Sequence, residues 1–397
     1  MGVLKNNVEQ GHRSMMCLPQ VLCIKKEIAF IISLFSFSNN FFYKKANIPL
    51  RITIEFQNNY MNKLLNLLAI ILFTVPSTHA QAQQDFQILK TFRIQSGGGW
   101  DYIAVGPGNN RLYVSHGTQV NILDKTTGDS IGIIENTPGV HGIAFDKSQN
   151  KGFTSNGRAN NVTVFDLKTN TLITQIPTGA NPDAIMYEPF TKRIITCNGR
   201  GKNLSFIDPV ANKLVDSIDV GGKPETAVSN GLGKLFVNIE DKNEIVVVDL
   251  KKMIVDAHWA IGPGEEPTGL VLDKNTNRLF AGCGNKFLIA LNAVTGKVVA
   301  SMPIGDGCDG VAFDNESKNI YTSNGEGTMS VFNEKSADKI EAIATVPTKR
   351  GARTITIDEQ THWLYLPAAD FESPDPKTPN ARPRMIPGTF QVLVVGK

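Results

Sequence analysis

A motif recurs seven times along this chain at a nearly constant spacing. Its copies begin WDYIAV, VHGIAF, PDAIMY, PETAVS, PTGLVL, CDGVAF and ARTITI. The second position of the motif falls at Asp101, His141, Asp183, Glu225, Thr268, Asp309 and Arg353, with successive spacings of 40, 42, 42, 43, 41 and 44 residues. A period of this length indicates one supersecondary unit repeated seven times.

The repeating unit has the pattern of four short strands. From Cys308 onward, the segments GVAF, IYTS, TMSVFN and KIEAIATV alternate apolar and polar residues, and the polar turns DNESKN, NGEG and EKSAD separate them. Such alternation predicts antiparallel strands. Four strands in a unit of about 42 residues are typical of a propeller blade. We therefore predict an all-β fold, a seven-bladed β-propeller with four-stranded antiparallel blades.

The seventh unit lacks its outer strand. It contains RTITI, HWLYLPA and FQVLVVGK, after which the chain ends. Residues Phe86 to Ile94 form a spare strand, and their sequence resembles the outer strands of the other units. We predict that this strand completes the last blade and closes the ring, since closure leaves no unpaired sheet edge. Residues 85–397 are then a single propeller domain.

The N-terminal part has the pattern of an export signal. From Met61 the chain reads MNKLLNLLAIILFTVPSTHAQAQQ, a short basic start, an apolar run and small residues at a cleavage site near Ala80 or Ala82. We predict a signal peptide over residues 61–80 and a periplasmic or secreted mature protein without a membrane span. Residues 1–60 are then an extension from a start codon assigned too early, disordered or absent. A membrane anchor around Ile28 to Phe42 is the alternative.

Charge and motifs exclude several functions. The chain has 40 Lys and Arg against 37 Asp and Glu, of which Met1 to Ala80 contribute 8 and 3, so the mature chain carries 32 against 34. This balance gives no reason to expect nucleic-acid binding. The sequence contains no nucleophile elbow, zinc-protease helix motif, phosphate-binding loop or haem-attachment motif. We expect a protein without catalytic residues.

The strand motifs resemble a known family. RLYVSHGTQVNILDKTTG, NKGFTSNGRANNVTVFDLKTN and NIYTSNGEGTMSVFNEKS are similar to the unit of the YVTN-repeat β-propellers, and the whole of Asp85 to Lys397 resembles their exported YncE-like branch. The resemblance implies the propeller fold. It leaves the activity open, because such propellers include redox subunits, lactonase-like enzymes, surface antigens and nucleic-acid binders. His116 stands where the repeat usually has Asn.

The motif's second position should line the mouth of the central channel. Strand order places these residues at one face of the disc, together with the connection after the second strand of each unit, where His116 lies. The ligand-binding candidates are therefore Asp101, His116, His141, Asp183, Glu225, Asp309 and Arg353. Carboxylates and imidazoles in a narrow opening could position a polar ligand or hold a divalent metal ion. His116 and His141 are the candidate metal ligands, with Asp101 or Asp183. The other interpretation is structural, because such side chains also accept hydrogen bonds in turns.

Three further features lie near this face. Arg158, Arg200, Arg382 and Arg384 form a candidate cationic rim, the last two in a proline-rich loop between Asp370 and Gly388 that either binds an anionic partner or covers the seam of the ring. Cys283 and Cys308 come from neighbouring units and form either a disulfide or two buried thiols. Cys197 is expected to be packed.

These features lead to three functional hypotheses. The first is an exported, non-catalytic monomer that binds a small anionic or polar ligand, or an envelope protein, at the channel mouth. The second is an enzyme, either a metal-assisted hydrolase of the lactonase type or a component of a periplasmic redox system. The third is a cell-envelope scaffold.

Overall fold

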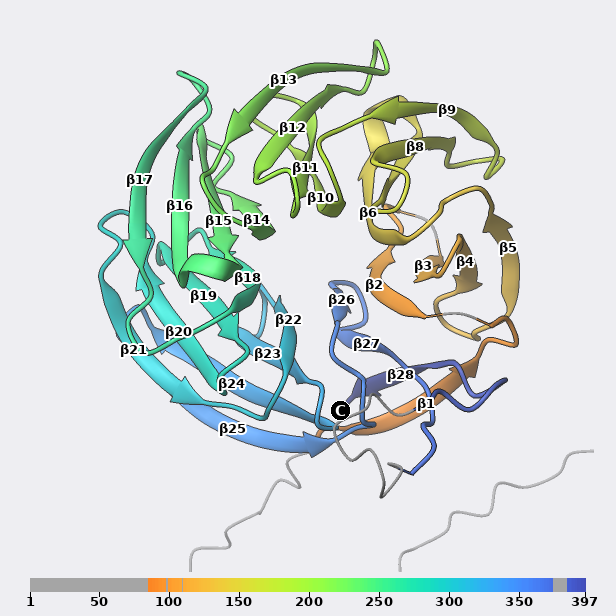
Figure 1. Cartoon of the computed structure of the whole chain (residues 1–397). Coiled ribbons are helices and arrows are strands. Elements are labelled where there is room, and N and C mark those ends of the chain that lie inside the picture. The colour runs from red at the N-terminus through yellow and green to blue at the C-terminus, as the bar shows by residue number, and fades with distance from the viewer. Residues whose placement is uncertain (1–84, 98, 109, 374–383) are drawn as a thin grey trace, which may run out of the picture. The chain divides into compact units, whose positions relative to one another are not determined.

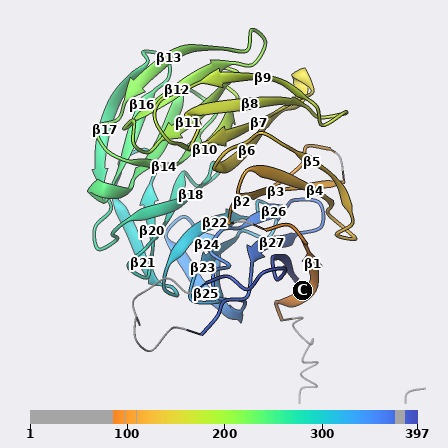
Figure 2. The same ribbon diagram turned by 45° about the vertical axis from the view of Figure 1, so that its right-hand side comes forward.

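The computed structural model describes residues 85–97, 99–108, 110–373 and 384–397. These residues belong to one compact unit, Gln84–Lys397. Seven four-stranded antiparallel sheets surround a central axis, as Figures 1 and 2 show. The fold is therefore the all-β seven-bladed propeller that the repeat predicted. The predicted signal peptide at 61–80, the extension at 1–60 and Arg382 lie outside the described residues.

Each blade runs from an inner strand to an outer strand. Blade 1 contains β2 (Trp100–Val105), β3 (Arg111–His116), β4 (Gln119–Asp124) and β5 (Ser130–Ile134). Blade 2 contains β6 (Val140–Asp146), β7 (Lys151–Asn156), β8 (Asn161–Asp166) and β9 (Leu172–Pro177). Blade 3 contains β10 (Pro182–Glu188), β11 (Arg193–Asn198), β12 (Asn203–Asp208) and β13 (Lys213–Asp219). Blade 4 contains β14 (Pro224–Ser229), β15 (Lys234–Ile239), β16 (Glu244–Asp249) and β17 (Ile254–Ala260).

The remaining blades follow the same order. Blade 5 contains β18 (Pro267–Asp273), β19 (Arg278–Cys283), β20 (Phe287–Asn292) and β21 (Val298–Pro303). Blade 6 contains β22 (Cys308–Phe313), β23 (Asn319–Asn324), β24 (Thr328–Ser336) and β25 (Lys339–Pro347). Blade 7 contains β26 (Thr356–Asp358), β27 (Trp363–Ala368), β28 (Gln391–Gly396) and β1 (Gln87–Arg93). Single 3-10 turns, η2 (Lys147–Gln149) and η3 (Glu240–Lys242), follow β6 and β15.

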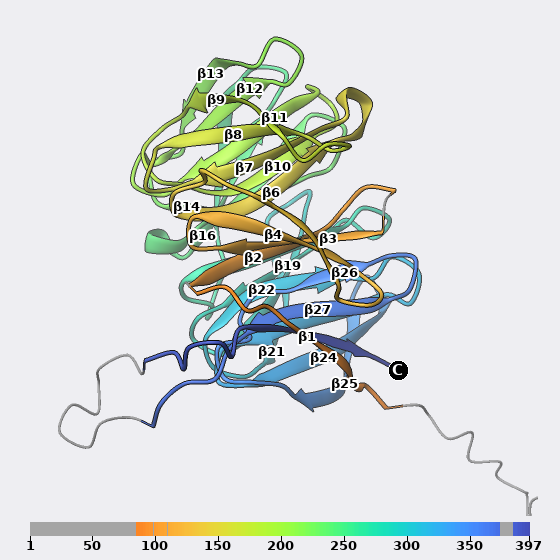
Figure 3. The same cartoon turned by 90° about the vertical axis from the view of Figure 1, so that its right-hand side faces the viewer.

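Strand β1 pairs antiparallel with β28, from Gln87 opposite Gly396 to Arg93 opposite Gln391. It thus takes the outer position of blade 7, and Figure 3 shows it along that blade from the side of the ring.

The core lies between neighbouring blades. The two middle strands of a blade are buried on both faces, as in β15 and β16, because another sheet packs on either side. The outer strand β17 instead alternates exposed and half-buried residues, since it lies at the rim. One apolar cluster joins Leu204 and Phe206 of blade 3 to Leu235 and Val246 of blade 4. Sheet-on-sheet burial of this kind is the main favourable term in the fold.

The TSNG segment of the repeat joins one blade to the next. In blade 2, the Ser155 hydroxyl accepts from the Gly142 amide at 2.8 Å and donates to the Asp183 carbonyl of blade 3. In blade 6, the Ser323 hydroxyl donates to the Arg353 carbonyl of blade 7 at 2.5 Å. The adjacent Asn156 side chain bonds within its own blade. The recurrence of this segment is therefore explained by scaffolding, through hydrogen bonds between blades.

A buried acid pair lies between blades 5 and 6, at the end of β18 remote from the motif's second position. Asp273 and Glu334 are both buried there, and the Lys318 ammonium lies 3.2 Å from Asp273. Burial and then the charge of Asp273 raise the pKa of Glu334 to about 7, against the opposing effects of Thr276 and Lys318. A carboxyl group with a raised pKa binds its proton more tightly in the folded chain than in the unfolded chain.

The stability of the protein should therefore fall as the pH rises from about 5 to 8. Glu334 contributes fully below its ordinary pKa of 4.5, and this contribution is lost as the pH passes through 7. Glu334→Gln should remove this loss, so that the variant becomes more stable than wild type by about 2 kcal/mol at pH 8. Urea unfolding at each pH measures the difference, and Glu135→Gln at an exposed site is the control. Parallel curves for wild type and Glu334→Gln would contradict the prediction.

Candidate functional site at the channel mouth

The backbone of the inner strands directs the motif's second residue into the channel mouth. Each of β2, β6, β10, β14, β18 and β22 has a register shift at this point, where the inner strand contains one residue more than its neighbour. A bulge turns a side chain out of the regular ladder and is common beside functional sites. The repeated bulge explains why residues so far apart in sequence line one opening.

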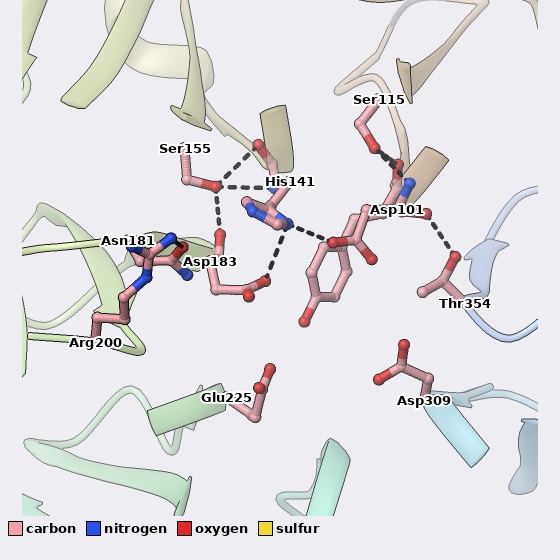
Figure 4. Close-up of polar contacts among 12 residues, drawn as sticks. Asp101, Ser115, His141, Ser155, Asn181, Asp183, Arg200, Glu225, Asp309 and Thr354 are labelled. Carbon is pink, nitrogen blue, oxygen red and sulfur yellow. Dashed lines mark hydrogen bonds and ion pairs between the residues drawn. The ribbon is translucent and has the colours of Figure 1, made fainter. Parts of the chain in front are cut away.

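His141 lies between two carboxylates at this opening (Figure 4). Its Nδ1 donates to Asp101 Oδ2 at 2.5 Å and lies 3.7 Å from Asp183 Oδ1. The three residues come from the inner strands of blades 1, 2 and 3. Their ligand atoms all lie within 4.8 Å of one another. Among the residues that the structure describes, no other group of three or more His, Cys, Asp or Glu side chains comes this close together.

Arg353 connects the other side of the mouth. Its guanidinium forms an ion pair with Asp309 and lies 3.3 Å from Asp101 Oδ1. The neighbouring Thr354 hydroxyl donates to the Asp101 carbonyl at 2.6 Å and so holds the backbone of Asp101 in place. The Arg353 side chain is 42% exposed, against 14% for Asp101. Arg353 is therefore accessible to a ligand at the mouth.

Glu225 forms a second acidic group a quarter of the way around the ring. The Lys223 ammonium lies 2.6 Å from Glu225 and also forms an ion pair with Glu240. Burial, the charge of Asp183 and the hydrogen bond with Glu240 raise the pKa of Glu225 to about 9. Lys223 and Glu240 were not among the predicted site residues, although Lys223 lies two residues before Glu225 and Glu240 directly follows the second strand of its blade, whose equivalent in blade 1 ends at His116.

Nearby carboxylates raise the pKa values of three groups at the mouth, Asp183, His141 and Tyr102. Burial and the charge of Asp101 raise the pKa of Asp183 to about 6. Burial lowers the pKa of His141, but the hydrogen bond to Asp101 and the charges of Asp183 and Asp101 outweigh it, so the pKa ends above its ordinary value. Burial followed by the same carboxylates also raises the pKa of Tyr102 well above its ordinary value. The site thus has an excess of negative charge, which favours cations.

Apolar cavities continue below the mouth. One of about 160 Å³ is lined by Tyr102, Met186, Cys197 and Thr226, and another of about 370 Å³ by Val271, Phe313 and Ile355 among others. The polar mouth therefore opens onto a largely apolar channel. This combination of convergent polar groups and apolar walls is typical of small-molecule sites.

The predicted pair of metal ligands, His116 and His141, is not the one that the structure brings together. His116 is buried, its Nδ1 lies 2.8 Å from Ser96 Oγ and 3.2 Å from Asn121 Oδ1, and its ring packs on Phe390. It sits at the end of β3, where it takes part in the packing of the seam between blades 7 and 1. His141 is joined by Asp101 and Asp183 instead.

The predicted disulfide between Cys283 and Cys308 is not formed. Both are free and buried, as is Cys197. The Cys283 thiol contacts the Ala281 carbonyl and the Cys308 thiol the Gly310 carbonyl. Burial raises the pKa of each thiol to about 12. The buried-thiol interpretation is the one that agrees with the structure.

The predicted cationic rim is more dispersed than the mouth. Arg158, Arg200 and Arg384 are exposed, and Arg200 donates to Asn181 Oδ1 at 3.1 Å. Near the described ends of the proline-rich loop, Phe371 packs on Trp100, which also stacks on Phe390. These aromatic contacts join blade 7 to blade 1, so the described part of this connection covers the seam of the ring.

The fold and the site together define the protein as a seven-bladed β-propeller with a polar, acidic channel mouth. No protein-family model matches the chain. No curated protein matches it either. Among solved structures 1830 chains match, which agrees with a fold shared by many functions.

One of these structures is hydrazine synthase of Kuenenia stuttgartiensis. The two are similar with a TM-score of 0.61 and 15% sequence identity over 72% of this chain and 96% of that chain. At this identity the similarity shows the propeller fold alone. In the described part of the chain there is no helix long and apolar enough to cross a membrane.

Proposed function

We propose that this protein is an exported, non-catalytic binding module that takes a small polar ligand into its channel mouth. The main support is that charged side chains from six blades converge on one opening. Among them, the ligand atoms of Asp101, His141 and Asp183 lie within 4.8 Å of one another. The apolar cavity directly below supports a pocket for a small molecule. The resemblance to the YVTN-repeat propellers and the signal-like segment at 61–80 support export.

The ligand should carry an anionic group that reaches Arg353. This guanidinium is the most exposed charge of the ring and presents its donors beside the opening. Lys223 is similarly exposed and flanks the opposite side. A carboxylate or phosphate would bind both by charge-assisted hydrogen bonds.

A thermal-shift series with simple probes tests this function. Malonate, succinate and inorganic phosphate are compared with putrescine as a cationic probe. An anion that binds should stabilise the fold by about 2.7 kcal/mol when present at 100 times its Kd. Arg353→Ala should abolish the shift, whereas Lys168→Ala, an exposed turn residue between β8 and β9, should leave it unchanged. If no anion shifts the melting temperature either with or without added Zn²⁺, or if Arg353→Ala responds like wild type, the anion-binding function is wrong.

Metal-assisted hydrolysis is the second candidate, favoured by the Asp101, His141 and Asp183 group. Such an enzyme would use a bound metal ion to activate water. Turnover of γ-butyrolactone by the purified protein with added Zn²⁺, lost in His141→Ala, would support it. Zn²⁺ binding without turnover would leave the binding module as the function.

A further inference from the structure

The mouth contains more negative charge than its basic groups neutralise. Four carboxylates, those of Asp101, Asp183, Glu240 and Asp309, face the three basic side chains of His141, Lys223 and Arg353, whereas Glu225 is neutral because its pKa is raised to about 9. Arg353 and Lys223 already pair with two carboxylates each, while Asp183 lies 3.7 Å from His141 Nδ1. An anionic ligand would therefore meet net repulsion unless a cation were bound first.

We propose that a divalent transition-metal ion of the zinc type binds between Asp101, His141 Nδ1 and Asp183. This inference rests on the binding function proposed above and deepens it. In a tetrahedral site with bonds of about 2.0–2.2 Å, neighbouring ligand atoms are separated by roughly 3.4 Å. The present separations from His141 Nδ1, 2.5 Å to Asp101 and 3.7 Å to Asp183, lie on either side of that value. Small side-chain rotations would thus complete the geometry.

The backbone holds the two carboxylate ligands in position. The Asp101 amide donates to Ser115 Oγ at 3.1 Å, and its carbonyl accepts from Thr354. The Asp183 carbonyl accepts from the Ser155 hydroxyl of blade 2. The last two of these hydrogen bonds connect neighbouring blades, so the backbone at both carboxylate ligands stays in place when the side chains move. Such support around the ligands is what metal sites need for affinity.

The ring of His141 is placed by a glycine. A Cβ atom on Gly157 would lie 2.6 Å from His141 Nε2, so the absence of a side chain there makes room for the imidazole. The ring then presents Nδ1, rather than Nε2, to the carboxylates. Blade 6 has Asp309 at the position that corresponds to His141. Of the seven blades, only blade 2 has an imidazole at this position.

The donor set favours a transition metal over Ca²⁺ or Mg²⁺. An imidazole nitrogen is a poor ligand for those hard cations, whereas one nitrogen and two carboxylate oxygens suit Zn²⁺, Mn²⁺ and Fe²⁺. Three protein ligands leave at least one coordination position free. Arg353, 3.3 Å from Asp101, stands beside this position. An anionic ligand would bridge the metal ion and the guanidinium.

Zinc titration of the chelator-treated full-length protein tests the site. Isothermal titration calorimetry and metal analysis after dialysis should give one equivalent of saturable Zn²⁺. His141→Ala and the isosteric Asp183→Asn should each weaken binding at least about tenfold. His258→Ala is the matched control, because His258 is another exposed imidazole beside a carboxylate, 2.9 Å from Glu244. The absence of saturable binding, or equal loss in His258→Ala and His141→Ala, overturns the proposal.

A second measurement separates the metal site from the binding function. Phosphate is added to wild type and to His141→Ala, with and without Zn²⁺, and the thermal shift is recorded. A shift that requires both Zn²⁺ and His141 supports the metal site. A shift that persists with chelator and in His141→Ala, but is lost in Arg353→Ala, overturns the metal site and leaves the binding function standing. Saturable Zn²⁺ binding without any anion shift confirms the metal site and refutes the anionic ligand.

Discussion

Deletion of Phe86 to Ile94, the segment that contains β1, should abolish the cooperative unfolding transition of the propeller. Without β1, blade 7 keeps three strands and β28 becomes an unpaired edge. The loss also opens the apolar cluster in which Phe92 and Ile94 pack with Leu112 of blade 1 and Tyr365 of blade 7. An open edge and an exposed core at one joint destabilise the whole ring, because each blade is stabilised by its neighbours.

A single substitution should reproduce part of this effect. The Phe92 ring lies where a side chain on Gly128 of blade 1 would be, 2.3 Å from the position of a Cβ atom. Phe92→Ala should therefore lower the free energy of unfolding by about 3–5 kcal/mol. Ile88→Ala on the same strand, where the side chain is 40% exposed, should change it by less than about 0.5 kcal/mol. Urea unfolding followed by far-UV circular dichroism measures both.

The deletion distinguishes closure from simple packing. If the deletion variant melts as cooperatively as wild type and at the same temperature, β1 contributes nothing to the stability of the ring and the closure prediction is wrong. The seam has other links, including the Lys125 to Asp358 ion pair at 2.8 Å, which would then have to hold the ring.

Phe165→Ala should be the most destabilising of the core substitutions in blade 2, with a loss of about 3–5 kcal/mol. Phe165 lies opposite Gly152 on the neighbouring strand, and its ring occupies the space that a Gly152 side chain would fill, with Cζ 2.0 Å from the Cβ position. The ring also packs on Tyr113 of blade 1. Since Gly152 has no side chain to relax into the gap, truncation should leave a large cavity.

The same pair predicts a compensating double substitution. Gly152→Ile alone should destabilise the fold by about 1–3 kcal/mol through overpacking. Combined with Phe165→Ile, it recreates the Ile194 and Ile207 pair of blade 3, and the double variant should recover part of the loss. Leu172→Ala, at an exposed position of β9, is the control. If the losses of unfolding free energy in the two single variants simply add in the double variant, the side chains at positions 152 and 165 do not compete for the same volume, and the prediction is wrong.

The sequence could predict which residues line the channel mouth, but not which of their side chains contact one another. The seven-fold period placed Asp101, His141 and Asp183 at one opening because equivalent positions of equivalent blades must share a face. It could not show which side chains meet. His116 stands at the end of β3, yet its ring turns into the seam against Phe390, which immediately precedes β28 of blade 7.

The sequence alone determined the strand pattern, the number of blades and the face that carries the polar residues. Each of these follows from local alternation and a fixed period, which any single blade already displays. The tertiary structure decided what depends on the angle and distance between blades. It placed His141 between two carboxylates, kept Cys283 and Cys308 as separate thiols, and brought Lys223 and Glu240 to Glu225. Contacts across a joint depend on side chains from two units at once, and a repeat pattern specifies only one unit at a time.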